Sequence, residues 1–476
     1  MVDIRRDSCL IDGEWVKGQA SMPVLNPADD SIVGEVPMLD ASQVEVAIAA
    51  ASRALPSWQA RPASERAAIL HRYNDLILAH EGELAALLTA EQGKPLAEAL
   101  GEIRYAASFI RWFAEEAVRV YGDVIPAQQP GTRIVVLKQP VGVVAAITPW
   151  NFPAAMVTRK VGPALAAGCT IIVKPAEQTP LTALALAALG EAAGLPKGVL
   201  NVVTGNARVI GPVLTASPVV RKLTFTGSTE VGALLYQQSA PTIKKLSLEL
   251  GGNAPFVVFD DASLEEAVAG AIASKFRNAG QTCVCADRFI VQSGIHDRFV
   301  QALAEAAGKL TVGRGDDAAS QIGPLIDDEA AAKVAARVAA AVEQGAKVAS
   351  GGFAVSGGPR YYAPTVLSEV RRDMELWASE NFGPLAPVIR FETEEEAIAL
   401  ANDTPYGLAG YLYTNDARRL WRVAERMECG MIGVNTGMIS TAVAPFGGIK
   451  QSGLGREGSH YGLDDYLELK TIMLAA

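Results

Sequence analysis

Short hydrophobic runs alternate with longer stretches rich in alanine and leucine from Val141 onward. The runs predict buried strands and the stretches predict helices, at 141–147, 154–167, 170–173, 181–193 and 199–203 in that order. At the second helix, Thr179 is the expected N-cap, Pro180 the first-turn residue and Gly194 the stop. This alternation of strand and helix predicts a parallel α/β sheet.

A second alternating unit extends from Pro255 to about Tyr413 and predicts another α/β domain. Within it, the capping box at 263–266 predicts a helix that runs toward Arg277. Two other stretches, 132–139 and 466–474, have the pattern of exposed strands, and long exposed strand edges normally need a partner. No repeat or low-complexity linker separates the two units, so the pattern alone does not locate their boundary.

The composition is typical of a globular protein that acts on small molecules. Of the 476 residues, 50% are hydrophobic and 20% are charged, which predicts two or three domains with ample core. The net charge of −10 and the lack of a basic tract argue against nucleic-acid and acidic-membrane partners. Because the apolar runs are shorter than the about 20 residues of a membrane span and residues 1–7 do not resemble a targeting peptide, we expect a cytoplasmic protein.

Cysteine and histidine are too scattered to predict a disulfide framework or a metal site. The five cysteines are odd in number and mostly far apart, which favours a reducing compartment. None of the four histidines lies at zinc-ligand spacing from another histidine or from the Cys283 and Cys285 pair, so we expect no metal. The same scarcity weakens a hydrolase interpretation based on Ser-His-Asp or Cys-His groups.

The candidate chemistry centres on Cys283 and Glu249, which lie 34 positions apart. A free cysteine is already a few per cent thiolate at neutral pH, so it can attack a carbonyl carbon. A carboxylate can then activate water to release the acyl group. The alternative is that Cys283 is a small buried hydrophobe and Glu249 a solvated charge, as most residues of these types are.

The segments around these two residues resemble the aldehyde dehydrogenase superfamily. The shared motifs occur in the family's order: TPWNFP (148–153), KPAE (174–177), FTGS (225–228), ELGG (249–252), GQTC (280–283), ENFGP (380–384) and PFGG (445–448). The resemblance implies a Rossmann-type NAD-binding domain, an α/β catalytic domain and a β-strand oligomerisation arm. The implied domains are NAD-binding at 1–122, 141–251 and 443–461, catalytic at 252–442, and arm at 123–140 and 462–476.

The same resemblance implies a reaction, in which an aldehyde is oxidised to a carboxylic acid with NAD or NADP. Cys283 would form a thiohemiacetal and then a thioester, and Asn151 with the Cys283 backbone N–H would stabilise the oxyanion. Glu249 would activate the hydrolytic water, and its presence favours hydrolysis over acyl transfer to coenzyme A. The arm strands imply a homodimer or a homotetramer.

The resemblance also implies which residues of this sequence bind the cofactor. The turn at 225–232 is not a G-x-G-x-x-G fingerprint and is weak evidence by itself. By resemblance, Ser228 and Trp150 contact the phosphates, Lys174 and Glu177 the adenosine ribose, and Glu380 and Phe382 the nicotinamide ribose and ring. Thr148 and Gly227 belong to the same segments. A carboxylate at Glu177 repels a 2′-phosphate, so we expect NAD to be preferred and NADP to remain possible.

The implied substrate is succinic semialdehyde. Succinate-semialdehyde dehydrogenases carry two arginines and a serine in contexts that match Arg159, Arg277 and Ser440, and these groups would bind a carboxylate. The alternative is that both arginines are helix-surface charges. Thr436 replaces a glutamate seen in some of these enzymes, so glutarate semialdehyde, other ω-oxo acids and broad aliphatic aldehydes stay open.

Two further hypotheses concern the nucleophile. Cys285 lies two residues from Cys283, and a disulfide between them would require the loop to rearrange, which suggests either a redox switch or a packed thiol.

Two alternatives belong to another functional class. They are a cysteine esterase or thioesterase without redox chemistry, and a non-catalytic binding protein. The cofactor motifs argue against the esterase, and intact Cys283, Glu249 and Asn151 argue against the binding protein.

Overall fold

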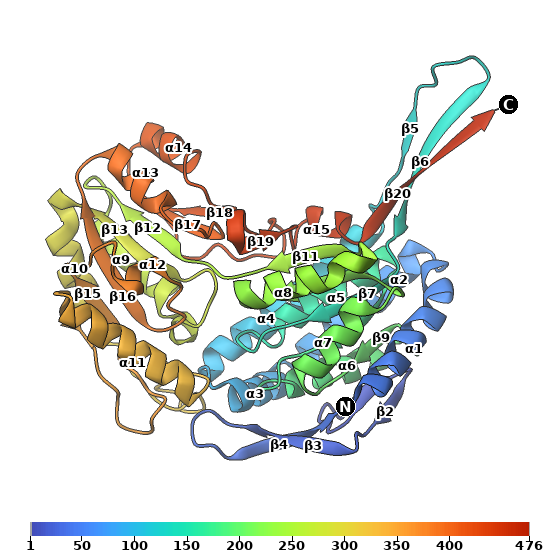
Figure 1. Ribbon diagram of the computed structural model, residues 1–476, viewed down its shortest axis with the longest axis horizontal. Helices are drawn as coiled ribbons and strands as arrows, with labels where there is room; N and C mark the ends of the chain where they lie inside the picture. The colour runs from blue at the N-terminus through green and yellow to red at the C-terminus, as the bar shows by residue number, and fades with distance from the viewer. Residues whose placement is uncertain (1, 476) are drawn as a thin grey trace.

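The computed structural model describes residues 2–475 and has two large sheets that lie side by side, with a β-ribbon projecting from one of them (Figure 1). The first sheet has eight strands in the order β19-β11-β10-β7-β8-β9-β1-β2, and β11 to β9 in that order run parallel. Its strands are β1 (Cys9–Ile11), β2 (Glu14–Val16), β7 (Val143–Ile147), β8 (Thr170–Lys174), β9 (Leu200–Val202), β10 (Val220–Thr226), β11 (Lys245–Glu249) and β19 (Gly453–Leu454).

Helices cover both faces of the first sheet, and a hairpin of β3 (Ala20–Leu25) and β4 (Ile32–Met38) accompanies them. The helices are α1 (Ala41–Gln59), α2 (Ala63–Ala79), α3 (Glu81–Gln92), α4 (Leu96–Ala117), α5 (Ala155–Ala167), α6 (Leu181–Ala192), α7 (Ala207–Ala216) and α8 (Thr229–Ser239), with a short 3-10 turn after α8 at Ala240–Thr242. The predicted strands at 141–147, 170–173 and 199–203 and the two helices between them are confirmed within a few residues.

The predicted start of α6 is wrong in one respect. Pro180, not Thr179, is the N-cap, and it supplies no side-chain cap. Instead, the carboxylate of Glu91 on α3 accepts hydrogen bonds from the N–H groups of Leu181 (2.8 Å) and Thr182 (2.9 Å). The Thr179 hydroxyl donates to the Trp150 carbonyl at 3.4 Å. A long-range carboxylate therefore replaces the local cap, and Gly194 ends the helix region with a φ of +97°, as predicted.

The second sheet has seven strands in the order β14-β15-β16-β13-β12-β17-β18, all parallel to their neighbours except β14. They are β12 (Ala254–Val258), β13 (Ala286–Gln292), β14 (Lys347–Ser350), β15 (Thr365–Ser368), β16 (Leu385–Phe391), β17 (Ala409–Tyr413) and β18 (Met431–Val434). The accompanying helices are α9 (Leu264–Lys275), α10 (Ser293–Ala307), α11 (Asp328–Glu343), α12 (Glu375–Ala378), α13 (Glu394–Asn402) and α14 (Ala417–Ala424).

The predicted helix after 263–266 is α9, although only half of the capping box forms. The Ser263 hydroxyl accepts a hydrogen bond from the Glu266 N–H at 3.4 Å. A 3-10 turn at Arg277–Gly280 then leads toward β13. The C-terminal part of the chain adds another 3-10 turn at Lys450–Ser452 and the short α15 (Tyr461–Asp464).

The projecting ribbon is a three-stranded antiparallel sheet of β5 (Asp123–Ile125), β6 (Thr132–Pro140) and β20 (Leu467–Ala475), in the order β20-β6-β5 (Figure 1). It confirms the two strands predicted at 132–139 and 466–474. Leu469 and Met473 on β20 are 70% and 72% exposed, so the ribbon presents apolar side chains to solvent. Its role in assembly and the domain bounds expected from the sequence stay predictions.

Candidate active site

The carboxyl ends of the parallel strands of the first sheet bring most of the predicted cofactor residues to one edge. Thr148 follows β7, Lys174 ends β8, Gly227 follows β10 and Glu249 ends β11. Strand β7 lies between β8 and β10, so the sheet extends in both directions from this point. Ligands of open α/β sheets bind at such a reversal of strand order.

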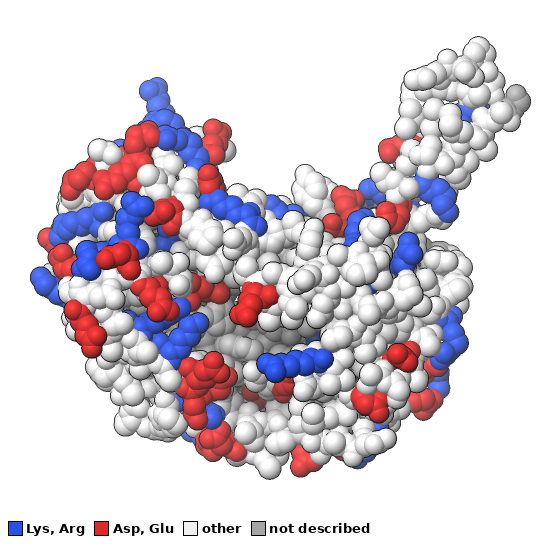
Figure 2. Space-filling view, viewed as in Figure 1, with Lys and Arg blue, Asp and Glu red and all other residues white. Residues whose placement is uncertain are grey.

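The second sheet contributes residues from the amino ends of its strands. Gly252 precedes β12, Cys283 precedes β13, and Glu380 and Phe382 precede β16. The Gly252 N–H donates a hydrogen bond to Glu380 Oε1 at 3.0 Å, which joins two of these segments. Figure 2 shows the molecular face hollowed between the two halves of the molecule. The candidate site therefore lies between two sheets that each supply one strand edge.

The loop before Cys283 is held in a strained conformation. Asn278 and Ala279 have positive φ values of 52° and 54°, and Gly280 follows with 74°. A Cβ atom at Gly280 would lie 2.1 Å from the Gly383 carbonyl oxygen, so only glycine fits there. Strain of this kind persists only where surrounding contacts impose it, and it clusters at functional sites.

The Cys283 thiol is half-buried at the end of this loop. Burial raises the pKa of Cys283 to about 12, and the positive charge of Arg159 acts in the opposite direction. The thiol is therefore protonated at neutral pH in this state of the protein. Its reaction requires a base or a change in its surroundings to increase the thiolate fraction.

Asn151 is buried beside the Cys283 loop. Its side-chain Nδ2 donates to the Gln281 carbonyl at 3.1 Å, while its Oδ1 has no hydrogen-bond partner. Its backbone carbonyl accepts from Lys94 Nζ at 2.8 Å and from Asn278 Nδ2 at 3.1 Å. The Asn151 amide is thus tied to the segment that carries Cys283.

Glu249 is 2% exposed, and neither of its carboxyl oxygens has a hydrogen-bond partner. Burial, and then the negative charge of Glu457, raise the pKa of Glu249 well above its usual value, while Arg159 and Lys160 oppose the shift. A carboxyl group whose pKa is raised in this way is suited to exchange a proton with a water molecule.

Arg159 on α5 lies close to these groups and is 1% exposed. Its Nε donates to Glu457 at 2.5 Å, and the Phe446 ring lies 3.9 Å from the guanidinium carbon. Its two terminal nitrogens, Nη1 and Nη2, are buried without a partner. Glu457 also pairs with Lys160 and raises the pKa of Arg159 against the effect of burial. The guanidinium therefore stays charged and presents two unused donors.

Arg277 and Ser440, the other two predicted substrate residues, are less buried than Arg159. Arg277 is half-buried, with Nη1 3.9 Å from Met438 Sδ and its guanidinium 5.5 Å from the Phe152 ring. Ser440 is half-buried in the segment after β18. Burial raises the pKa of the Tyr105 hydroxyl, and the positive charges of Arg159 and Arg277 both oppose that rise. Both guanidiniums are thus close enough to Tyr105 to influence its hydroxyl.

The cofactor side has groups that fit a dinucleotide. Lys174 Nζ lies 3.0 Å from Glu177 Oε2, and Glu177 Oε1 accepts the Ala207 N–H at 2.7 Å, with 38% of the Glu177 side chain exposed. Ser228 is the N-cap of α8, whose amino end faces the carboxyl edge of the sheet. The buried hydroxyl of Thr148 lacks a partner.

The aromatic rings of Trp150 and Phe382 meet across the two sheets. Their centroids are 5.5 Å apart with an edge-to-face angle of 84°. Phe382 has a φ of +50°, which adds another strained residue to the site. Burial raises the pKa of the neighbouring Glu380 to about 7, and the Gly252 N–H opposes the shift.

Known proteins match the chain over nearly its whole length. The profile of the Aldehyde dehydrogenase family matches residues 15–472. The chain belongs to this family. It is 58% identical to the NADP(+) succinate-semialdehyde dehydrogenase GabD of Escherichia coli, over 98% of this chain and 97% of the relative. It is also 58% identical to a glutarate-semialdehyde dehydrogenase of Pseudomonas aeruginosa, over 98% of each chain.

A crystal structure of succinate-semialdehyde dehydrogenase from Burkholderia pseudomallei has a TM-score of 0.98 to this chain and 57% identity, covering 99% of this chain and 98% of that one. The aldehyde dehydrogenase fold predicted from the motifs is therefore confirmed. The chain is an NAD(P)-dependent aldehyde dehydrogenase that oxidises an aldehyde.

Several residues of this aldehyde dehydrogenase site were not predicted from the sequence. Glu457 holds Arg159 and Lys160, Lys94 holds the Asn151 carbonyl, and Tyr105 has an unpartnered hydroxyl near both arginines. The sequence neighbours of Lys94 and Glu457 are not hydrophobic, so no local signal marks either charge as buried. A charged residue in such a context does not distinguish a buried ion pair from a solvated side chain.

Cys285 is separated from solvent, although it lies only two residues from Cys283. Cys285 is buried, and its Sγ lies 3.5 Å from the Lys275 carbonyl, so it packs against the end of α9. The redox hypothesis for Cys285 stays a prediction. Within residues 2–475, no group of three or more His, Cys, Asp or Glu side chains is placed to hold a metal ion. No helix in the same range is long and apolar enough to cross a membrane.

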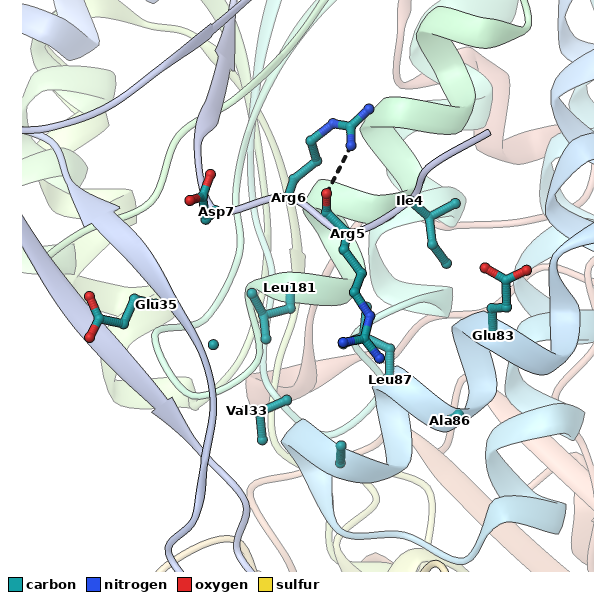
Figure 3. A pocket seen from close by; sticks show the side chains of 12 residues that line it. Ile4, Arg5, Arg6, Asp7, Val33, Glu35, Glu83, Ala86, Leu87 and Leu181 are labelled. Atoms are coloured by element: carbon teal, nitrogen blue, oxygen red, sulfur yellow. Dashed lines mark hydrogen bonds between the residues drawn. The ribbon is translucent and has the colours of Figure 1, made fainter. Parts of the chain in front are cut away.

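A separate cavity of about 640 Å³ lies between the N-terminal segment, β4, α3 and the start of α6 (Figure 3). Arg5 and Glu83 are among its charged lining residues, and Leu87 and Leu181 are among its apolar ones. None of its lining residues belongs to the predicted catalytic, cofactor or substrate groups.

Proposed function

We propose that the chain oxidises an aldehyde that carries a carboxylate at its other end, with succinic semialdehyde as the first candidate. The observation that carries this proposal is the buried Arg159 guanidinium, whose Nη1 and Nη2 lack partners. Buried donors without partners cost free energy, and a carboxylate is the group that satisfies two guanidinium donors at once. An anionic substrate end supplies that partner.

In the proposed mechanism, the Cys283 thiol loses its proton and the thiolate adds to the aldehyde carbon. The carbonyl oxygen becomes an oxyanion, which accepts hydrogen bonds from the Asn151 amide and the Cys283 N–H. The nicotinamide ring of bound NAD(P) supplies the hydride acceptor. Loss of hydride from the thiohemiacetal carbon leaves a thioester on Cys283.

Glu249 then completes the proposed reaction. Its carboxylate takes a proton from water, the resulting hydroxide adds to the thioester carbon, and the Cys283 thiolate leaves. The carboxylic acid is the product. The lack of any hydrogen-bond partner for the Glu249 carboxyl group supports this role, because a reacting water would find both oxygens free.

For the cofactor, we propose that NAD is preferred over NADP. Glu177 is held by Lys174 and by the Ala207 N–H, so its carboxylate has a defined position at the carboxyl edge of the first sheet. A carboxylate accepts bonds from ribose hydroxyls and repels a 2′-phosphate. The Escherichia coli relative is named for NADP(+), so this preference needs a direct test.

Glutaric semialdehyde is the second candidate substrate. Relatives named for succinate and for glutarate semialdehyde are both 58% identical to this chain. The two aldehydes differ by one methylene, and apolar contacts discriminate a methylene by only about 1 to 3 kcal/mol. The unpartnered donors of Arg159 suit either carboxylate.

We also propose that the β5-β6-β20 ribbon joins copies of the chain into a homodimer or a homotetramer. The exposed apolar side chains of Leu469 and Met473 support this assembly, since long strand edges with apolar residues normally find a partner. Light scattering of the purified protein gives the number of chains directly. A monomer at micromolar concentration would contradict the proposal.

The test of the proposed reaction is the rate of nicotinamide reduction with three aldehydes and two cofactors under a thiol reductant. Succinic semialdehyde, glutaric semialdehyde and butanal are each combined with NAD and with NADP. We expect both carboxylated aldehydes to exceed butanal in kcat/KM, and NAD to exceed NADP. Equal or better use of butanal would contradict the carboxylate proposal.

A Glu177→Ser variant should gain activity with NADP relative to NAD, and no gain would contradict the role of Glu177.

A further inference from the structure

Three charged residues near the start of α4 contact three parts of the site, and they occur at intervals of four positions in the sequence. They are Lys94, Glu98 and Glu102, and Lys94 lies two residues before the first residue of α4, in the loop after α3. Glu98 and Glu102 lie on one face of α4, because positions four apart share a face of a helix. None of them is among the predicted catalytic, cofactor or substrate residues.

Of these three residues, Lys94 is the one that contacts Asn151. Its ammonium group is fully buried and lies 2.5 Å from Glu102 Oε2, 2.8 Å from the Asn151 carbonyl oxygen and 3.8 Å from the centroid of the Phe152 ring. Burial lowers the pKa of Lys94, and the charge of Glu102 opposes that shift. Three fixed partners from two different segments therefore hold one ammonium group in place.

Glu102 extends the contact to α5. Its other oxygen, Oε1, accepts the N–H of Ala154 at 2.9 Å and the N–H of Ala155 at 3.3 Å. These are first-turn amides of α5, whose N-cap residue has no side-chain cap of its own. The α5 helix carries Arg159, so Glu102 anchors the element that positions the unpartnered guanidinium.

Glu98 contacts the loop that precedes Cys283. Its Oε2 accepts the Asn278 N–H at 2.8 Å, and Asn278 is the first of the three residues with positive φ before Cys283. Asn278 Nδ2 in turn donates to the same Asn151 carbonyl that Lys94 holds. The face of α4 thus contacts both sides of the space between Asn151 and Cys283.

We propose that Lys94 is a positioning residue, which holds the backbone of Asn151 so that its side-chain amide is aimed at the oxyanion formed on the substrate. The inference deepens the proposed function, because it rests on the role of Asn151 as an oxyanion donor. An oxyanion donor is effective only at the right distance, and displacement of about 1 Å can cost about 100-fold in rate. In the proposed mechanism, Lys94 contacts neither the aldehyde nor the cofactor.

The test is a double-mutant cycle on kcat with succinic semialdehyde, built from Lys94→Met, Asn151→Ala and the combination. We expect Asn151→Ala to lower kcat by about 100-fold or more. Lys94→Met alone should lower kcat by about 10- to 100-fold with KM changed less than about threefold. In the Asn151→Ala background, Lys94→Met should lower kcat by no more than about twofold, because two changes that act through one group are not additive.

Three controls separate positioning from a loss of structure. Alkylation of Cys283 by iodoacetamide should stay within about twofold of the wild-type rate in Lys94→Met, since the thiol itself is not displaced. Lys94→Arg should restore part of kcat. Lys197→Met, at an exposed lysine paired with Glu14, should leave kcat unchanged. If Lys94→Met does not fold because Glu102 loses its partner, the cycle uses Lys94→Met with Glu102→Gln, which keeps an acceptor for α5 and removes both charges.

The outcomes distinguish the two levels of the account. If Asn151→Ala leaves kcat unchanged, the proposed role of Asn151 is wrong, and the inference falls with it. If Asn151→Ala lowers kcat but Lys94→Met lowers it by the same factor in both backgrounds, Asn151 keeps its role and the inference about Lys94 is overturned.

Discussion

The protein contains two groups of buried charges close to the same reaction site, and they differ in how well they are paired. At the start of α4, the buried Lys94 and Glu102 and the half-buried Glu98 each make at least one hydrogen bond to a fixed partner. On the other side, both oxygens of Glu249 and two nitrogens of Arg159 have no partner. Buried polar groups in proteins are normally paired, so the unpaired ones need an explanation.

We infer that the difference separates groups that hold the site from groups that react or bind. A fully paired buried ion pair has no donor or acceptor left for a substrate, and its value lies in fixing geometry. An unpaired buried group carries a cost that a reactant can remove. Glu457 and Glu249 illustrate this, because both are buried and yet their pKa values shift in opposite directions.

The physical cause is the number of cations that each carboxylate contacts. Burial acts to raise the pKa of Glu457, but Lys160 and Arg159 outweigh it and the net shift is downward. Glu249 has no contact with either cation, so burial dominates and its pKa rises. Glu457 is therefore the stable anion of the pair, and Glu249 is the one able to exchange a proton.

The largest expected effect comes from removing the carboxyl group of Glu249, which we propose exchanges a proton with water. Glu249→Gln cannot take a proton from water, so the thioester should accumulate and steady-state kcat should fall by about 10³-fold. A rapid burst of about one reduced nicotinamide per active site should remain, which stopped-flow absorbance measures. Loss of the burst together with the steady state would show that Glu249 acts before thioester hydrolysis.

The paired carboxylate should matter for stability. Glu457→Gln leaves Arg159 and Lys160 as two buried cations without a carboxylate, which should lower the free energy of unfolding by about 3 kcal/mol. Urea unfolding followed by circular dichroism gives this value. A change within about 0.5 kcal/mol would contradict the assignment of Glu457 as the structural anion of the cluster.

The pH dependence of Cys283 alkylation tests the unpaired region. Only the thiolate reacts, and its fraction increases with pH until the pKa, which burial raises to about 12. The rate of alkylation by iodoacetamide in the absence of cofactor should therefore increase by about tenfold per pH unit from pH 7 to pH 10. A plateau below pH 9 would mean that the thiol is less buried or more strongly paired than the structure indicates.

The smallest effect is expected for an ion pair on the surface. Glu395 pairs with Arg426 between α13 and the segment after α14, and both side chains are largely exposed. Solvent screens such pairs, so Glu395→Gln should leave both kcat and the urea midpoint unchanged. This variant is the matched control for Glu457→Gln, since both replace a paired glutamate by glutamine.

The sequence predicted the central strands and the family well, because each signal was local. Buried strands of the first sheet are continuous runs of β-branched and small residues, and the motifs around Cys283 and Glu249 are short contiguous segments. The start of α6 was misjudged because its cap comes from Glu91, about 90 residues away. The partner of Arg159 could not be predicted either, since Glu457 is separated from it by 298 positions.

The central claim is that the unpaired guanidinium of Arg159 recognises the carboxylate of the substrate. The most direct measurement is the ratio of kcat/KM for succinic semialdehyde to that for butanal, compared between the wild type and Arg159→Met. The ratio cancels any change in the reactivity of Cys283 or Glu249 that affects both aldehydes equally. We expect the ratio to fall by about 100-fold, as for the loss of two charge-assisted hydrogen bonds. An unchanged ratio, with both aldehydes slowed alike, would contradict the claim.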